Sequence, residues 1–501
     1  MGAPQAFGEL KTRLGQVTDL RRVLRLLSWD LQVILPPAGA ATRAEQQATI
    51  DRTAHELFTS PETGRLLEEL RTYEDSLDPD SDDASLIRVS REDYEKAVLV
   101  PVELRSEMVR AATEGYQAWR EAKPANDFDS FRPYLEHHME LRQRYVDCFP
   151  PGDEPYDVLL DDYERGMKAA EVRAVFDRLK EELIPLAFEA SEAYGADEGL
   201  LSRSFPKDAQ VALCAEVLRL FGHRENAWRI DPTLHPFASG GGIDDIRITT
   251  RYEPVGLESL FATMHEYGHG LYEHQVAPEL ERTPLGSGVS LGLHESQSRM
   301  WENLVGRSRG FWRFFYPRLQ AHFPEQLGDV DEETWYRTVN RVQPSLIRIA
   351  ADEVTYNMHV ILRFELEQDL LAGNVPLTEL PTEWNQRMHD YLGVEVPDDA
   401  RGVLQDMHWS MGTIGYFPTY SLGNVMSVQI WEKVKDEISD LDDQIERGEF
   451  VQLREWLGEN IHRHGRKFRP QDTLEHAVGS TIDPEPYLKY LREKHGAAAL
   501  A

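Results

Sequence analysis

The segment around residue 265 holds the residue types and spacing of a metal site. His265, Glu266 and His269 form the pattern HExxH within the stretch LESLFATMHEYGHGLYEH. On an α-helix, residues four apart differ by about 400°, so both imidazoles project from one face and can bind one zinc ion. Glu266 is poorly aimed as a ligand, but its carboxylate can take a proton from a water on the metal. The pattern therefore predicts a metal-assisted hydrolytic site with Glu266 as general base.

A catalytic zinc site of this kind needs one more protein ligand. The third histidine of the metzincin pattern is absent, because Gln275 occupies its position. Glu295 lies 26 residues after His269, beyond a loop rich in proline and glycine, and is predicted to reach the metal from a return helix. Two imidazoles and one carboxylate leave the fourth tetrahedral position for water. Cobalt or manganese would suit a similar geometry.

Three polar residues near these ligands are expected to support them. Glu302 lies seven residues beyond Glu295, almost on the same helix face, and is predicted to accept a hydrogen bond from a ligating imidazole. A solvent-facing helix carboxylate is the alternative for Glu302. His274 and His294 are interpreted as hydrogen-bonded neighbours, because three protein ligands already complete the set.

The elements that carry these residues are predicted to be mainly helical. Apolar residues recur at helical spacing along most of the chain, with clear examples over residues 20–31, 172–183 and 354–364. Strand-like alternation is clearest over Ile246–Tyr252, which follows a Ser239–Gly242 turn and leads into a helix that begins near Leu257. No internal repeat or long linker divides the chain, so we predict one continuous domain over residues 1–501.

The composition excludes several classes of protein. The 501 residues carry a formal net charge of −33, which argues against nucleic acid and anionic membranes as partners. No run approaches the roughly 18 apolar residues of a membrane span, and the N-terminus lacks a signal-peptide pattern, so we expect a cytoplasmic protein. Cys148 and Cys214 are too few and too far apart for a disulfide framework or a cysteine zinc site.

Further motifs stand in a fixed order around HEYGH. They are His235-Pro236-Phe237, DxRxT at Asp245–Thr249, His294-Glu295-Ser296-Gln297, IRxxAD at Ile347–Asp352, and GxxQDxHW at Gly402–Trp409, together with an N-terminal segment from Trp29-Asp30 to Pro36. With these motifs the chain resembles the carboxypeptidase Taq (thermostable carboxypeptidase 1) family of zinc metallopeptidases over nearly its whole length.

The resemblance implies a metal-dependent carboxypeptidase that releases single C-terminal amino acids with broad specificity and disfavours proline. It implies a mainly helical body of two lobes around a deep substrate groove, with a small β element near the active site. It places the catalytic segment at about residues 230–425 and makes a homodimer the expected assembly. The expected substrates are peptides with a free C-terminus.

The matched motifs also supply candidates for substrate contacts. Arg348 is the first candidate for binding the C-terminal carboxylate, because its guanidinium can bond both oxygens. The alternative is a structural ion pair with Asp352, one helical turn away. Arg247 is the second candidate, and its strand could pair with the substrate backbone or serve only as packing. Further substrate-binding residues carried over from the motifs are His235, Asp245 and Thr249.

The oxyanion that forms during hydrolysis needs hydrogen-bond donors. His408, Tyr416 and Tyr420, within HWSMGTIGYFPTYSLGN, are candidates for this role. Tyrosines in an aromatic-rich stretch are more often core residues, so we expect only one of the two phenols to act as a donor.

Two other functions remain open from the sequence. The first is an endo-acting or dipeptide-releasing oligopeptidase of the gluzincin type, which would share HExxH and the remote glutamate. The second is a helical binding protein without catalysis, in which the metal is only structural. Glu266 beside the ligands counts against this second function, because a purely structural site needs no base.

Overall fold

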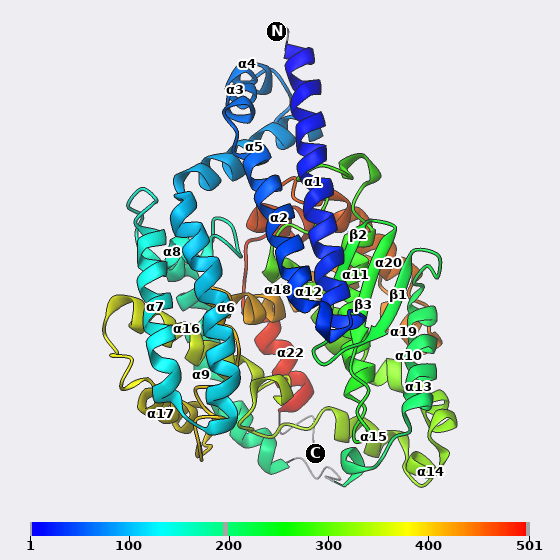
Figure 1. Cartoon of the computed structure of the whole chain (residues 1–501). Helices are drawn as coiled ribbons and strands as arrows, with labels where there is room; N and C mark the ends of the chain where they lie inside the picture. Colours follow the sequence, from blue (N-terminus) through cyan, green and yellow to red (C-terminus); the bar gives the residue numbers. More distant parts are fainter. Residues whose placement is uncertain (1–2, 194–198, 497–501) are drawn as a thin grey trace.

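Helices make up most of the chain, as the apolar periodicity predicts. The computed structural model describes residues 3–193 and 199–496 (Figure 1). The helices before the sheet are α1 (Ala3–Val33), α2 (Ala40–Phe58), α3 (Pro61–Glu69), α4 (Arg71–Glu74), α5 (Asp82–Leu99), α6 (Val102–Ala125), α7 (Phe128–Val146), α8 (Pro155–Leu160), α9 (Ala169–Ala193) and α10 (Lys207–Phe221).

The helices after the sheet carry the predicted metal ligands and most of the core. They are α11 (Glu258–His274), α12 (Leu291–Arg299), α13 (Arg309–His322), α14 (Pro324–Leu327), α15 (Glu332–Val339), α16 (Tyr356–Ala372), α17 (Leu380–Leu392), α18 (Pro418–Glu437), α19 (Leu441–Arg447), α20 (Val451–Asn460), α21 (Pro470–Val478) and α22 (Glu485–His495). Within the described ranges, no helix is long and apolar enough to cross a bilayer.

Local signals end the helices where the sequence places them. Most of the periodic run over residues 354–364 lies in α16, which begins at Tyr356. The helix stops at Gly373, whose φ of 72° lies in the left-handed region that glycine adopts without strain. Ser290 caps the N-terminus of α12, because its side-chain oxygen accepts a hydrogen bond from the backbone N–H of Leu293. The helix predicted to begin near Leu257 is α11.

A three-stranded sheet lies beside α11. Its strands are β1 (Trp228–Pro232), β2 (Ala238–Gly242) and β3 (Asp245–Thr250), in the order β1-β3-β2. Strand β3 pairs parallel with β1 and antiparallel with β2. Its side chains alternate as predicted as far as Ile248, with Ile246 and Ile248 buried, but Thr249 is buried as well and the strand ends at Thr250 rather than at Tyr252.

The sheet order corrects two expectations. The segment Ser239–Gly242 is not a turn, because it lies within β2, where small residues still permit extended pairing. Strand β3 is bonded on both sides, so its backbone has no free edge. The hypothesis that β3 pairs with the substrate backbone is therefore wrong, and β2 is the edge strand next to the cavity described below.

Helix α1 lies across the sheet and is held there by an aromatic contact (Figure 1). The indole of Trp29 is buried, and its ring centroid lies 4.7 Å from the guanidinium of Arg229 and 4.4 Å from that of Arg247. These two arginines are direct partners in the β1–β3 register. These two cation–π contacts couple the first helix of the chain to the sheet.

Candidate metal centre

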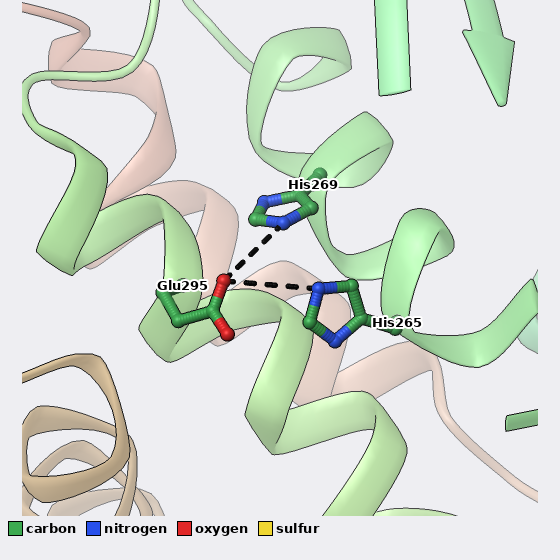
Figure 2. A group of neighbouring side chains, drawn as sticks. All are labelled: His265, His269 and Glu295. Carbon is green, nitrogen blue, oxygen red and sulfur yellow. Dashed lines mark ion pairs between the residues drawn. The ribbon is translucent and has the colours of Figure 1, made fainter. Parts of the chain in front are cut away.

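Helices α11 and α12 bring the three predicted ligands together (Figure 2). Nε2 of His265 lies 3.7 Å from Oε2 of Glu295, and Nε2 of His269 lies 3.6 Å from the same oxygen. In a tetrahedral zinc site with bonds of about 2.0–2.1 Å, ligand atoms are about 3.4 Å apart. The observed spacing therefore fits one small divalent cation among these atoms.

Two glycines allow the helices to approach this closely. A Cβ added to Gly268, between the two histidines, would lie 2.4 Å from the backbone oxygen of Gln297. A Cβ added to Gly423 on α18 would lie 2.5 Å from Cβ of Glu295. Helix α12 is thus confined between α11 and α18, and the absence of two side chains determines where Glu295 lies.

Each carboxylate oxygen of Glu295 has a separate role. Oε2 faces the two imidazoles, whereas Oε1 accepts a hydrogen bond of 2.7 Å from Nε of Arg299. Glu295 is 4% exposed, so this bond prevents the second oxygen from being buried without a partner. The arrangement favours a ligand that uses one oxygen.

Glu302 lies within hydrogen-bond distance of one of the predicted ligand imidazoles, as the sequence predicts. Its Oε2 lies 2.9 Å from Nδ1 of His265 and 3.2 Å from Nη1 of Arg299. The residue lies in a π-helical turn, Met300–Val305, that directly continues α12. Burial opposes the charged carboxylate, but Arg299 and His265 hold the pKa of Glu302 well below its ordinary value.

The ligand set favours a positive charge at its centre. Burial lowers the pKa of His265, but the carboxylates of Glu295 and Glu302 outweigh this effect and raise it. Glu266 is only 5% exposed, and burial raises its pKa to about 7. Oε2 of Glu266 has no hydrogen-bond partner in the described part of the chain. The residues present thus fit a metal ion with a free carboxylate beside it.

A cavity of about 440 Å³ opens onto these groups. Its walls come from α1, β2, α11, α12, α18 and adjoining loops, and they include Arg22, Arg25, Phe237, Ser239, Gly240, Glu266, Glu273, His294, Tyr416 and Tyr420. This volume lies within the usual range for small-molecule and peptide sites. The cavity corresponds to the groove that the resemblance implies.

The predicted oxyanion donors differ in their access to this cavity. Tyr416 and Tyr420 both line it, whereas His408 does not. Nε2 of His408 lies 3.3 Å from the hydroxyl of Tyr420, so the imidazole contacts the tyrosine without lining the cavity itself. Burial, with a contribution from nearby Arg348, lowers the pKa of His408 to about 4. A neutral imidazole therefore supports Tyr420.

Arg348 lies in a buried charge cluster and does not line the cavity. Its guanidinium donates to Asp406 at 2.7 Å and to the hydroxyl of Tyr356 at 2.9 Å. Asp406 also accepts a hydrogen bond of 2.8 Å from Arg363. The alternative prediction, an ion pair between Arg348 and Asp352, is wrong. Asp352 accepts backbone hydrogen bonds instead, and Arg348 begins a 3₁₀ turn rather than an α-helix.

The substrate candidates on the sheet point elsewhere. Arg247 donates to Asp245 at 2.9 Å and stacks on Trp29, so neither residue of this pair lines the cavity. Thr249 is fully buried, and its hydroxyl bonds the backbone N–H and C=O of Phe237. His235 is exposed and does not line the cavity. These motif residues position α1 and the cavity wall at Phe237.

The sequence interpretation missed several residues beside the metal ligands. Glu273 follows His269 by four residues on α11, and this spacing alone indicates a shared helix face. His294 is hydrogen bonded to both Glu273 and His269, as expected of a neighbour, but its link to Glu273 was not foreseen. Arg22 and Arg25 line the cavity from α1, and no local signal connects them to residues some 240 positions later.

Comparison with known proteins gives consistent similarities over the whole chain. Residues 9–495 match the family of carboxypeptidase Taq (M32) metallopeptidases. The chain is 41% identical to thermostable carboxypeptidase 1 of Thermus thermophilus over 483 residues, which is 94% of each chain. It is 34% identical to carboxypeptidase 1 of Bacillus subtilis over 484 residues, 96% of each chain. The crystal structure of an M32 carboxypeptidase from Deinococcus radiodurans R1 superposes with a TM-score of 0.96 at 40% identity, covering 99% of this chain and 100% of that one.

Proposed function

The chain belongs to the carboxypeptidase Taq (M32) family of metallopeptidases, and from this premise we propose that it releases single C-terminal amino acids from peptides with zinc as its metal. Its relatives are named carboxypeptidases, so the chain is a peptide hydrolase. The observation that carries the proposal is the convergence of His265, His269 and Glu295 beside the buried carboxylate of Glu266. We expect broad specificity with proline disfavoured.

The metal would be held by Nε2 of His265, Nε2 of His269 and Oε2 of Glu295. When bound, the ion supplies Lewis acidity toward the peptide carbonyl and lowers the pKa of a water molecule toward about 7. Two nitrogen ligands and one oxygen ligand suit zinc, and cobalt or manganese are possible substitutes.

Glu266 is the general base in this proposal. It takes the proton of the attacking water and then returns that proton to the leaving amine. Its position supports this role, because Oε2 is buried at the cavity wall and free of other partners among the described residues. A carboxylate without competing hydrogen bonds can turn toward water and then toward the amine.

One of the two cavity tyrosines donates its hydroxyl to the developing oxyanion. Tyr416 and Tyr420 lie close together, with ring centroids 5.3 Å apart. The contact of 3.3 Å between His408 and the Tyr420 hydroxyl holds the latter phenol in place. His408 therefore acts through Tyr420, since it does not line the cavity.

Recognition of the substrate terminus rests on the charge cluster behind Tyr420. Arg348 and Arg363 share the single carboxylate of Asp406, so these three groups retain one positive charge. The guanidinium of Arg348 lies 4.9 Å from the ring centroid of Tyr420. This charge attracts the free carboxylate of a peptide terminus through the cavity wall.

The substrate backbone has a partner in β2. This strand is at the edge of the sheet, and Ala238, Ser239 and Gly240 line the cavity. Hydrogen bonds between the backbone of β2 and the substrate backbone do not depend on the substrate's side chains, which agrees with broad specificity.

The proposal is tested by incubating a mixed set of peptides with the protein and following their masses. Each sequence is offered with a free C-terminal carboxylate and as a C-terminal amide, with and without a chelator. We expect stepwise loss of single residues from free C-termini only, abolished by the chelator and restored by zinc.

Other outcomes would identify the competing functions. Cleavage of amidated peptides within the chain, or release of dipeptides, would favour an oligopeptidase and contradict the proposal. An inert protein that still binds the metal would favour a non-catalytic role. We also propose a homodimer from the family resemblance, and light scattering at twice the 57.5 kDa of the chain checks it.

A further inference from the structure

The two ligand imidazoles differ in what lies behind them. Nδ1 of His265 bonds directly to the carboxylate of Glu302 at 2.9 Å. Nδ1 of His269 instead lies 3.2 Å from Nδ1 of His294, whose Nε2 lies 2.8 Å from Oε1 of Glu273. His269 is therefore connected to a carboxylate only through a second imidazole.

The chemistry of the ligand fixes the direction of these hydrogen bonds. A neutral imidazole that binds a metal through Nε2 has its proton on Nδ1, so His269 must donate to His294. Nδ1 of His294 is then the acceptor, and its single proton lies on Nε2. From that atom His294 donates to Glu273, which also accepts the backbone N–H of Gly288 at 3.0 Å.

The surrounding side chains leave His294 little freedom to rotate. Its ring centroid is 4.8 Å from that of Tyr272, and a Cβ on Gly288 would lie 2.5 Å from its ring. Both ring nitrogens are occupied by His269 and Glu273, so His294 has no nitrogen left for the metal. Nη1 of Arg25 lies 3.9 Å from Oε2 of Glu273, so the chain of contacts from His269 through His294 and Glu273 ends at Arg25 in the cavity wall.

We propose that His294 is a positioning residue that fixes the tautomer and orientation of His269 and connects it to the negative charge of Glu273. This inference rests on the proposed metal centre, but it does not depend on the substrate or on the peptidase activity. Outer hydrogen bonds of this kind contribute about 10- to 100-fold to metal affinity.

Two amide substitutions separate the two links of His294. Asn in His294→Asn places an acceptor oxygen near the position of Nδ1 and cannot reach Glu273. Gln in His294→Gln places a donor near the position of Nε2 and offers no acceptor at the Nδ1 position. The two variants have the same chemistry and similar size, so any general effect on folding is shared between them.

The measurement is the affinity of the full-length metal-free protein for Zn²⁺ alone, in competition with a chromophoric chelator. The visible spectrum of the Co²⁺ form reports the ligand geometry in parallel, and thermal unfolding of the metal-free variants reports stability. His274→Asn is the control, because His274 ends α11, the helix that carries His265 and His269, and its Nδ1 contacts the backbone oxygen of Ile243 at 2.6 Å and Asp244 at 3.9 Å, not the proposed ligands.

We expect His294→Gln to weaken Zn²⁺ binding about 10- to 100-fold and to alter the Co²⁺ spectrum. His294→Asn should show less than about a third of that loss of Zn²⁺ affinity on a logarithmic scale. Glu273→Gln should fall between the two His294 variants, because His269 keeps its tautomer when the charge of Glu273 is removed. The control should bind as the unchanged protein does. Equal losses for Asn and Gln, the reverse order, or unchanged affinity in both variants would overturn the role of His294.

Discussion

Each side chain proposed to bind the metal makes a hydrogen bond through the atom that does not face the proposed ion. Glu302 bonds His265, His294 bonds His269, and Arg299 bonds the outer oxygen of Glu295. Because these hydrogen bonds already fix the side chains, little rotamer entropy remains to be lost when a cation binds. Glu266 is the exception at this site, since its Oε2 has no partner among the described residues.

This freedom of Glu266 leads to a prediction at the residue scale. Replacing Glu266 with Gln removes the proton acceptor but keeps the size of the side chain. We expect kcat/KM to fall by about 10²- to 10⁴-fold, while one metal ion per chain stays bound by elemental analysis. Glu258→Gln is the matched control, because that exposed glutamate begins the same helix. Substantial turnover by the Glu266 variant would eliminate it as the base.

At the scale of elements, α12 is confined between α11 and α18 by the two glycines of those helices. Gly268 faces the backbone of α12, and Gly423 faces the side chain of Glu295. Packed interiors respond to added volume by shifting whole helices, since neighbouring groups have no space to yield. The position of Glu295, a proposed ligand, therefore depends on two glycines that are not themselves proposed to bind the metal.

Gly423→Ala tests this dependence. The new methyl group would overlap Cβ and Cγ of Glu295, at 2.5 and 2.7 Å, and displace the carboxylate from the two histidines. We expect weaker Zn²⁺ retention on dialysis and a loss of about 1–3 kcal/mol in the free energy of unfolding.

Gly8→Ala provides the control for this substitution. Gly8 also lies in a helix, but nothing lies within 4 Å of an added Cβ there. The alanine should raise the stability slightly, by about 0.5–1 kcal/mol, because glycine loses more backbone entropy on folding. Unchanged metal affinity in the Gly423 variant would contradict this prediction and show that α12 can shift while the three proposed ligands keep their arrangement.

At the scale of the whole molecule, folding buries carboxylates whose ionisation opposes the folded state. Glu164 is fully buried behind α12, where Oε2 accepts the backbone N–H of Gly292 at 2.9 Å. Burial raises the pKa of Glu164 from 4.5 to about 7, although the bond from Gly292 favours the ionised form. Oε1 has no partner among the described residues, so an amide fits the same place.

Glu164→Gln should therefore change how stability depends on pH. Because the pKa is higher in the folded state, the folded protein binds more protons between about pH 4.5 and 7, and its stability falls as the pH rises through that window. The loss of unfolding free energy caused by ionising Glu164 reaches its full value above pH 7 and is on the order of 3 kcal/mol. We expect the variant to gain that amount in urea unfolding at pH 8 and much less at pH 5.

Glu455→Gln, at an exposed carboxylate, is the control for this measurement. The expected result is a difference between the two pH values that is larger for Glu164 than for Glu455. An equal gain at both pH values would mean that the amide stabilises through packing and that Glu164 is ionised in the folded protein throughout this range.

Local geometry accounts for what could be predicted from the sequence alone. The spacing of His265 and His269, the distance to Glu295 and the periodic runs determine the metal-binding helix, its return helix and a mainly helical fold. These features depend on the turn of an α-helix and on contacts between residues close in the chain. The place of Glu302 behind His265 follows from the same helical spacing.

Only the tertiary structure decided which distant residues meet. Arg348 bonds Asp406, 58 positions away, rather than Asp352, and Arg247 stacks on Trp29 of α1 rather than facing the cavity. The edge strand that lines the cavity is β2, and His294 lies between His269 and Glu273. Helical spacing is set by hydrogen bonds within a few residues, whereas these contacts depend on how the whole chain fills its interior and pairs its buried charges.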